Sequence, residues 1–153
     1  MDFAAFLNAV ERTPEGLRAE IPEGWKQGRT AYGGMSAALC LSAAKARLEP
    51  ARPLRSALIG FVGPAEGRVS VTAEPLRSGK TASSVRARLT GEAGIGTEAI
   101  FTFAAPRGSA LAHAGPGLPA EASAPPRDAQ GEDFPFGAPQ FTANFELLPA
   151  AGG

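Results

Sequence analysis

Apolar side chains recur at helical spacing close to the N-terminus. In residues 1–11 the apolar positions 3, 6, 7 and 10 fall on one face of a helix, which is the pattern of an amphipathic helix on a core. The Pro-Glu-Gly sequence at 14–16 is expected to end it. A short apolar strand over 17–21 and a polar, Gly-containing loop over 25–32 come next.

A second helical stretch, residues 33–48, has almost no polar face. Residues 33–44 carry no charge and are mostly Ala, Ser and Gly. Lys45 and Arg47 come in the last turn, where a positive charge suits the helix dipole. Because a helix that is apolar or small on every side is buried on every side, the sequence predicts one long buried helix here.

Strict alternation of apolar and polar side chains replaces the helical period after residue 53. Alternation of period two marks strands with one face on a core, and it predicts four of them, at 54–62, 69–74, 85–90 and 99–103. The connectors at 63–67, 78–79 and 91–94 have hairpin length and contain Gly, which predicts an antiparallel meander. Residues 1–104 are therefore expected to form one α+β domain, an antiparallel sheet wrapped around the long buried helix.

The chain changes character after residue 104. Pro and Gly become frequent in residues 105–140 and periodicity is lost, which is typical of a linker. Residues 141–149 alternate again and predict a strand. An isolated strand is not stable alone, so this one is expected either to join the existing sheet or to open a further unit.

Charge and cysteine content exclude several classes of function. The net charge is zero, and a nucleic-acid binder needs a basic surface. The single cysteine, Cys40, has no disulfide partner, and no N-terminal leader or apolar run of membrane-spanning length is present. We therefore expect a cytoplasmic protein that binds neither nucleic acid nor membrane. The lack of a His/Cys cluster speaks against a metal site, and the sole histidine, His113, falls in the linker, which makes a Ser-His-Asp triad improbable.

Three sequence features together resemble a known family. They are Tyr32-Gly33-Gly34 at the start of the long helix, the turn Leu76–Ser83 (LRSGKTAS), and the aromatic strand end Ile100–Phe103 (IFTF). Over roughly residues 20–104 the chain is similar to the N-terminal half of the acyl-CoA thioesterase II-like, double-hotdog thioesterases. The resemblance implies a hotdog domain over 1–104, and it makes residues 141–153 the first strand of a second hotdog repeat.

The resemblance also implies an activity, hydrolysis of an acyl thioester to the free acid and CoA. No cofactor is implied beyond the CoA of the substrate. In the family, the Asp, Ser/Thr and Gln that orient the attacking water lie in the second repeat, so they have no counterparts here. Hydrolysis would then need a carboxylate from a second repeat or a partner subunit, and we expect hotdog–hotdog pairing, as a homo-oligomer or with a second repeat.

The candidate site is the amino end of the long helix. The first turn of a helix has free N–H groups and a positive dipole end, and glycine lets a ligand approach the backbone. The N–H groups of Gly34 and Met35 are therefore candidate oxyanion donors. The alternative is that Gly33 and Gly34 only let the chain enter a tightly packed helix.

Three further side chains are candidates for substrate binding together with Gly33. Tyr32 is expected either to line the acyl pocket or to pack at the sheet edge. Arg77 and Lys80 flank a turn and are suited to the phosphates of CoA, although solvated charges beside a hairpin are the commoner case. Two other functions stay open: a non-catalytic module that binds an acyl ligand, and the structural N-terminal half of a two-repeat thioesterase.

Overall fold

The computed structural model describes residues 2–111, 115, 117, 137–146 and 148. The helices are α1 (Phe3–Ala9) and α2 (Gly33–Lys45), with the 3-10 helices η1 (Glu23–Trp25) and η2 (Gln140–Asn144). The strands are β1 (Glu11–Thr13), β2 (Gly16–Glu20), β3 (Lys26–Gln27), β4 (Thr30–Ala31), β5 (Leu54–Phe61), β6 (Arg68–Ser78), β7 (Ala82–Gly91) and β8 (Gly94–Ala104).

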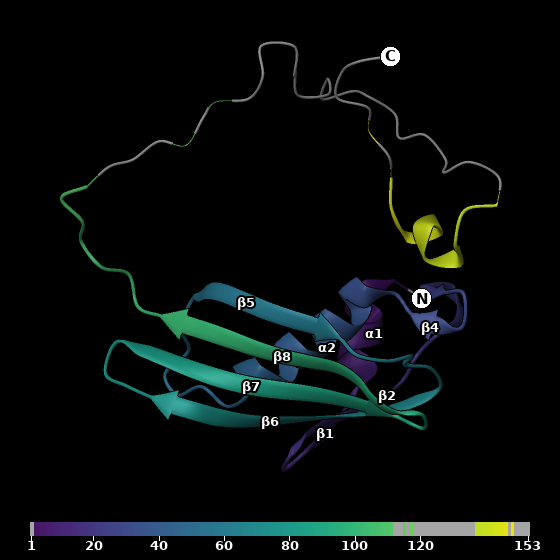
Figure 1. The fold of residues 1–153 in the computed structure, drawn as a ribbon, viewed down its shortest axis with the longest axis horizontal. Coiled ribbons are helices and arrows are strands. Elements are labelled where there is room, and N and C mark those ends of the chain that lie inside the picture. Colours follow the sequence, from purple (N-terminus) through teal and green to yellow (C-terminus); the bar gives the residue numbers. More distant parts are fainter. Residues whose placement is uncertain (1, 112–114, 116, 118–136, 147, 149–153) are drawn as a thin grey trace.

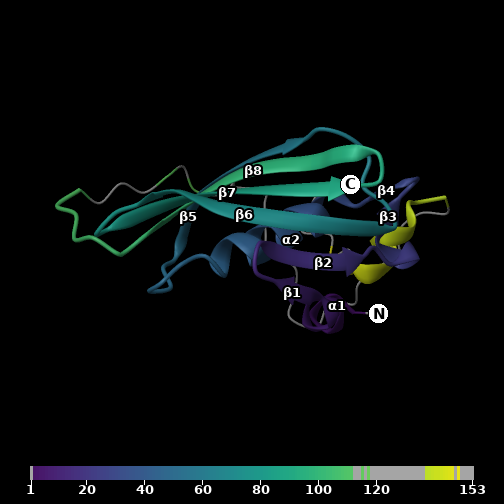
Figure 2. The same ribbon diagram turned by 90° about the horizontal axis from the view of Figure 1, so that it is seen from below.

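A six-stranded antiparallel sheet in the order β1-β2-β6-β7-β8-β5 packs against α2, and β3 and β4 pair separately (Figure 1). Figure 2 shows α2 on one side of the sheet, with α1 beside β1 and β2. The predicted α+β architecture, an antiparallel sheet around one helix, is confirmed.

The core lies between α2 and the sheet. Met35, Leu39 and Cys40 on α2 are fully buried, as are Val85 and Phe103 on the facing strands. The helix can lie close to the strands because Ala, Ser and Gly make up most of it. Alternation along β7 and β8 follows the pleat of the sheet: in β7, for example, positions 83, 85, 87 and 89 are buried.

The prediction that α2 is buried on every side is wrong. The face with Met35, Leu39 and Ala43 is buried, whereas Ala37, Ala38, Leu41 and Ser42 on the other side are only half-buried. The reason is geometric, because the sheet curves over one side of the helix. The small, uncharged side chains of the second side are nonetheless compatible with further packing.

The predicted four-strand meander is wrong at its first connection. β6, β7 and β8 do follow one another as hairpins, but β5 pairs with β8, and β6 pairs with β2. The connector after β5 does not close a hairpin, because its backbone bonds elsewhere. Ala31 N–H donates to the Ala65 carbonyl (2.6 Å) and the Ala65 N–H donates to Thr30 Oγ1 (2.9 Å). The connector thus crosses the end of the sheet, and β5 becomes an edge strand.

The strand predicted over 141–149 is also wrong in its first part, since Gln140–Asn144 form η2. Phe141 and Phe145 are four residues apart, so the compact 3-10 conformation lets both rings contact the aromatic cluster near Tyr32. Most of the predicted linker, and the end of the predicted strand, lie outside the described residues. The assignment of 141–153 to a second repeat stays a prediction.

Candidate active site at the start of α2

The first turn of α2 begins at a backbone cap supplied by Tyr32. The Tyr32 carbonyl accepts hydrogen bonds from the N–H groups of Met35 (2.9 Å) and Ser36 (3.2 Å). Gly33 and Gly34 precede these donors, and helix geometry offers their N–H groups no partner within the helix. Of the two predicted oxyanion donors, Gly34 therefore presents an N–H at the positive end of α2, whereas the Met35 N–H already bonds to Tyr32.

The two glycines make room for two aromatic rings. A Cβ on Gly33 would lie 2.9 Å from Cζ of Phe61, and a Cβ on Gly34 would lie 2.9 Å from Cζ of Tyr32. Both distances are too short for a real side chain. The glycine pair therefore lies beside two aromatic rings, that of Phe61 at the end of β5 and that of Tyr32, and a Cβ at either glycine would force the neighbouring ring to move.

A cavity of about 700 Å³ opens at this point. It lies between the start of α2, the end of β5 with its connector to β6, and the start of β8. Its lining residues are Gln27, Thr30, Ala31, Tyr32, Gly33, Gly34, Ser36, Phe61, Val62, Gly63, Pro64, Ala65, Gly96 and Thr97. None of these described lining residues is charged or a histidine, so the cavity offers hydroxyl and backbone groups but no acid or base of its own.

Hydrogen bonds hold the lining in place. Thr30 and Ala31 bond to the backbone of Ala65, as described above, and the Tyr32 N–H donates to the Trp25 carbonyl (2.8 Å). Ser36 and Thr97 in the wall are almost fully buried. Phe61, Gly96 and Thr97 were not predicted as site residues, because alternation along β5 and β8 does not show which strand ends meet at the helix start.

Arg77 and Lys80 lie at the opposite end of the sheet. Arg77 pairs with Ser84 near the start of β7, whereas Thr97 in the cavity pairs with Leu89 near the end of that strand. In Figure 1 the β6–β7 turn lies at the left and β4 at the right. Within this chain the structure thus brings Tyr32, Gly33, Gly34 and Met35 together, and it keeps the two basic residues apart from them.

Arg52 supports the turn that carries these basic residues. Its guanidinium donates to the carbonyls of Gly79 (2.9 Å) and Lys80 (3.1 Å) and to the hydroxyl of Ser83 (2.9 Å). Arg55 and Arg107 line a second hollow beside this turn. No sequence pattern pointed to Arg52, because it lies 27 residues before Gly79 along the chain. This end of the sheet is therefore cationic, and the cavity end has an uncharged lining.

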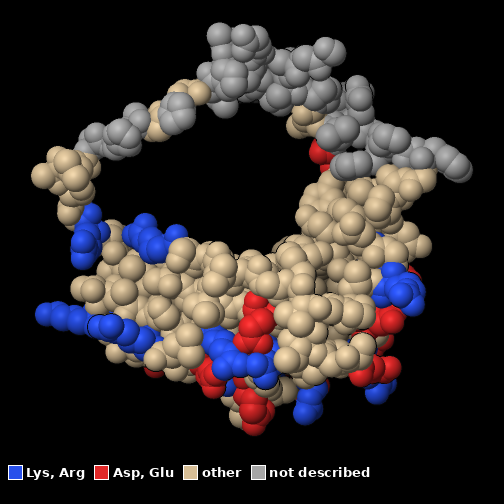
Figure 3. All heavy atoms as spheres, viewed as in Figure 1, with Lys and Arg blue, Asp and Glu red and all other residues tan. Residues whose placement is uncertain are grey.

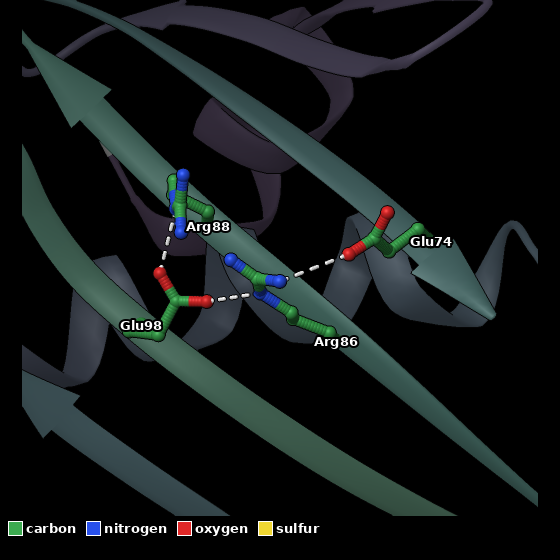
Figure 4. A network of polar contacts seen from close by, with 4 residues as sticks. All are labelled: Glu74, Arg86, Arg88 and Glu98. Carbon is green, nitrogen blue, oxygen red and sulfur yellow. Dashed lines mark hydrogen bonds and ion pairs between the residues drawn. The ribbon is translucent and has the colours of Figure 1, made fainter. Parts of the chain in front are cut away.

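The most extensive ion-pair network in the described residues lies outside the site, on the outer face of the sheet (Figure 4). Glu98 accepts from Arg86 Nε (2.5 Å) and Arg88 Nε (2.6 Å), and Arg86 also bonds to Glu74 (3.2 Å). Partial burial raises the pKa of Glu98, but the bonds from Arg88 and Arg86 outweigh it, so its pKa is lowered from 4.5. The network joins β6, β7 and β8 and takes no part in the cavity.

Cys40 is the one cysteine of the chain, and it is not a nucleophile in this structure. It is fully buried in α2, and burial raises the pKa of its thiol to about 12. The thiolate, the reactive form, is therefore scarce near neutral pH. A covalent mechanism through Cys40 is accordingly not supported.

The described residues contain neither a metal-ligand cluster nor a helix of membrane-spanning length. No group of three or more His, Cys, Asp or Glu side chains is arranged there to hold a metal ion. Within the same residues, no helix is both long and apolar enough to cross a membrane. His113 lies outside the described residues.

Comparison with known proteins identifies the fold. A family model described as the acyl-CoA thioesterase N-terminal domain matches residues 21–104. A comparison with curated proteins found no match. A protein of unknown function with a hot dog fold from Alicyclobacillus acidocaldarius superposes with a TM-score of 0.74 at 20% identity, over 90% of this chain and 50% of that one.

Two other solved structures share this fold. A putative thioesterase II from Thermobifida fusca gives a TM-score of 0.69 at 21% identity, over 88% of this chain and 50% of that one. A Bacillus halodurans protein, whose structure was determined with CoA, gives 0.58 at 18% identity, over 68% and 76%. The chain thus spans about half the length of the Alicyclobacillus and Thermobifida proteins. At these identities the likeness establishes the fold, which is the predicted hotdog.

Proposed function

The chain belongs to the acyl-CoA thioesterase N-terminal domain family, and from this premise we propose that it binds an acyl thioester of CoA at the start of α2. The observation that carries the proposal is the first turn of α2, where Gly33 and Gly34 line a cavity of about 700 Å³. The CoA in the Bacillus halodurans structure supports this choice of ligand.

The chemistry would use the free N–H of Gly34. In thioester hydrolysis a water oxygen attacks the carbonyl carbon, and negative charge develops on the carbonyl oxygen. The carbon–sulfur bond then breaks, and the proton taken from the water passes to the departing sulfur, which leaves as the thiol of CoA. An N–H at the positive end of a helix stabilises the developing charge. The Met35 N–H would contribute only by exchanging its bond to Tyr32 for one to the substrate.

Deprotonation of the water needs a base from outside this cavity, since its described lining is uncharged. We assign that base to a carboxylate of a second hotdog unit, in a further repeat or in a partner subunit. With it the reaction is hydrolysis to the free acid and CoA.

The edge strand β5 is the surface that we assign to this second hotdog unit. Leu58, Phe61 and Val62 are 71%, 62% and 63% exposed, and Ile100 beside Leu58 is partly exposed. Figure 3 shows basic side chains at one end of this edge and mostly uncharged side chains along the rest of it. An exposed apolar edge strand invites pairing with another strand.

Pairing of two β5 strands about a two-fold axis would also explain the separated basic residues. An antiparallel pair sets the start of one β5 beside the end of the other. The start of β5 lies at the cationic end of its own sheet, with Arg77 and Lys80. Its end lies at the cavity. Each unit would thus offer its basic end to the phosphates of a CoA held in the cavity of the other.

A second candidate function follows from the same uncharged lining. Without a carboxylate, the chain would hold an acyl-CoA and leave it intact, as a binding module or as the structural half of a two-repeat enzyme. The span of about half the length of two structural relatives supports this second possibility.

The test measures binding and turnover separately with purified protein. Titration calorimetry with acetyl-, octanoyl- and benzoyl-CoA measures binding, and release of the CoA thiol measures hydrolysis. Cys40 should not interfere with the thiol assay, since it is buried. We expect Gly34→Ala to weaken binding about tenfold or more, because its Cβ displaces the Tyr32 ring and covers the N–H.

Gly24→Ala is the matched control, because a Cβ at Gly24 meets nothing within 4 Å. Binding of an acyl-CoA that is weakened in Gly34→Ala and kept in Gly24→Ala supports the proposal, and thiol release decides between hydrolysis and binding alone. If the unaltered protein neither binds nor cleaves any of the three thioesters, the proposal fails.

A further inference from the structure

The C-terminal described segment returns to the candidate site and covers one of its walls. Phe141 stacks on Tyr32 with ring centroids 4.2 Å apart and an interplanar angle of 7°. Phe145 meets the same ring edge-on at 5.8 Å. In Figure 1 this segment, drawn in yellow, lies beside β4 and near α1. A part of the chain more than a hundred residues after Tyr32 thus contacts the residue that opens α2.

Further contacts with η1 hold the segment beside Tyr32. The Asn144 side-chain amide donates to the Gly24 carbonyl (2.7 Å). Phe145 packs edge-on against Trp25 at 5.9 Å, and Trp25 in turn contacts Phe3 of α1 at 5.6 Å. The segment is therefore fixed to η1 as well as to Tyr32, and Trp25 of η1 is in turn in contact with α1.

The Tyr32 ring has both Phe141 and the first turn of α2 as close neighbours. Phe141 lies against one face, and the backbone of Gly34 lies so close to the ring that no Cβ would fit there. Phe61, the other ring beside the glycine pair, is 62% exposed. The cavity thus has one aromatic wall that is clamped and one that is largely open to solvent.

We propose that Phe141 is a positioning residue: by stacking on Tyr32 it holds that ring along the first turn of α2 and so sets the width of the cavity beside Gly34. That this width selects among acyl groups rests on the proposed function. A stacked aromatic pair is stabilised beyond the burial of its two rings, and this stabilisation biases the position of the Tyr32 ring. When Phe141 is removed, the Tyr32 ring is free to turn away from the cavity. CoA thioesters with bulkier acyl groups then bind more tightly relative to those with small ones.

The positioning itself is tested without any ligand. Tyr32 is the only tyrosine of the chain, so incorporation of 3-fluorotyrosine places fluorine at this ring alone. We expect Phe141→Leu to move the fluorine resonance toward that of free fluorotyrosine, because the ring current of Phe141 is lost. Phe3→Leu, which removes a ring of the same cluster that contacts Trp25, should leave the resonance in place. An unchanged resonance in Phe141→Leu overturns the proposal.

The second arm measures selectivity as the ratio of the dissociation constants for acetyl-CoA and benzoyl-CoA. We expect Phe141→Leu to shift this ratio about fivefold in favour of the benzoyl group, within the range that pocket shape commonly gives. Phe141→Trp, which can still stack and adds no second tyrosine, should restore the ratio and keep the resonance apart from that of free fluorotyrosine. A changed resonance with an unchanged ratio overturns the role in selectivity. If the unaltered protein binds no acyl-CoA, the proposed function fails, and the fluorine spectra alone decide whether Phe141 positions Tyr32.

Discussion

At the scale of single residues, the glycine pair shows what a sequence can and cannot reveal. The sequence identifies Gly33 and Gly34 as a place where a ligand could reach the backbone. It does not show that Phe61 and Tyr32 occupy the space beside them, because those contacts depend on the fold around α2. Nor does it show that the Met35 N–H bonds to Tyr32. The glycine pair that opens α2 could be located from the sequence, whereas the rings beside it could not.

A prediction at the same scale concerns Glu98 in the outer-face network. Replacement by Gln removes the charge that Arg86 and Arg88 contact, so we expect Glu98→Gln to lower the free energy of unfolding at pH 7 by roughly 0.5–1 kcal/mol. The pKa of Glu98 is lowered in the folded protein from 4.5. Its contribution is therefore present above about pH 4.5 and is lost as the pH falls through the folded-state pKa.

Urea unfolding at pH 7 and pH 3 measures this difference. The difference in free energy of unfolding between the unaltered protein and Glu98→Gln should be smaller at pH 3 than at pH 7. Glu92→Gln, in the exposed turn between β7 and β8, serves as control and should change little at either pH. A gap for Glu98→Gln that is equally wide at both pH values would contradict the assignment.

At the scale of elements, periodicity predicted the strands but not all of their neighbours. The apolar and polar alternation located β5, β6, β7 and β8 to within a few residues, and the chargeless stretch located α2. The place of β5 beside β8 could not be predicted, because alternation identifies the face of a strand and not its partner. Short elements such as β3 and β4 carry too few residues for any period.

A prediction about β5 tests whether its edge is a pairing surface. Leu58 is 71% exposed, so Leu58→Lys should fold as well as the unaltered protein while placing a charge on the proposed interface. We expect the unaltered protein to associate as a dimer in sedimentation or light scattering, and we expect Leu58→Lys to weaken that association at least about tenfold.

Leu111→Lys provides the matched control, since Leu111 is 86% exposed and lies beyond the sheet. It should dimerise as the unaltered protein does. A monomeric unaltered protein, or a Leu58→Lys variant that associates with full strength, would remove β5 as the pairing surface.

At the scale of the whole molecule, the hotdog has two chemically different ends. One end holds an uncharged cavity at the amino end of α2, and the other holds the basic residues around the β6–β7 turn. The resemblance of residues 20–104 to a thioesterase family predicted both parts as one substrate site. The structure separates them within this chain, which no local pattern could reveal, because their distance depends on the direction of the strands. A second hotdog paired at β5 is the arrangement that we propose to reunite them.

The central claim, that an acyl thioester carbonyl is bound at the first turn of α2, is tested most directly by amide NMR. A ketone analogue of octanoyl-CoA, with a methylene group in place of the sulfur, keeps the carbonyl and cannot be hydrolysed. On titration with this analogue, the account predicts that the amide resonances of Gly33 and Gly34 move the most, with that of Gly96 across the cavity also shifting. Saturable binding that leaves the Gly33 and Gly34 amides unmoved, while resonances elsewhere in the protein respond, would contradict it.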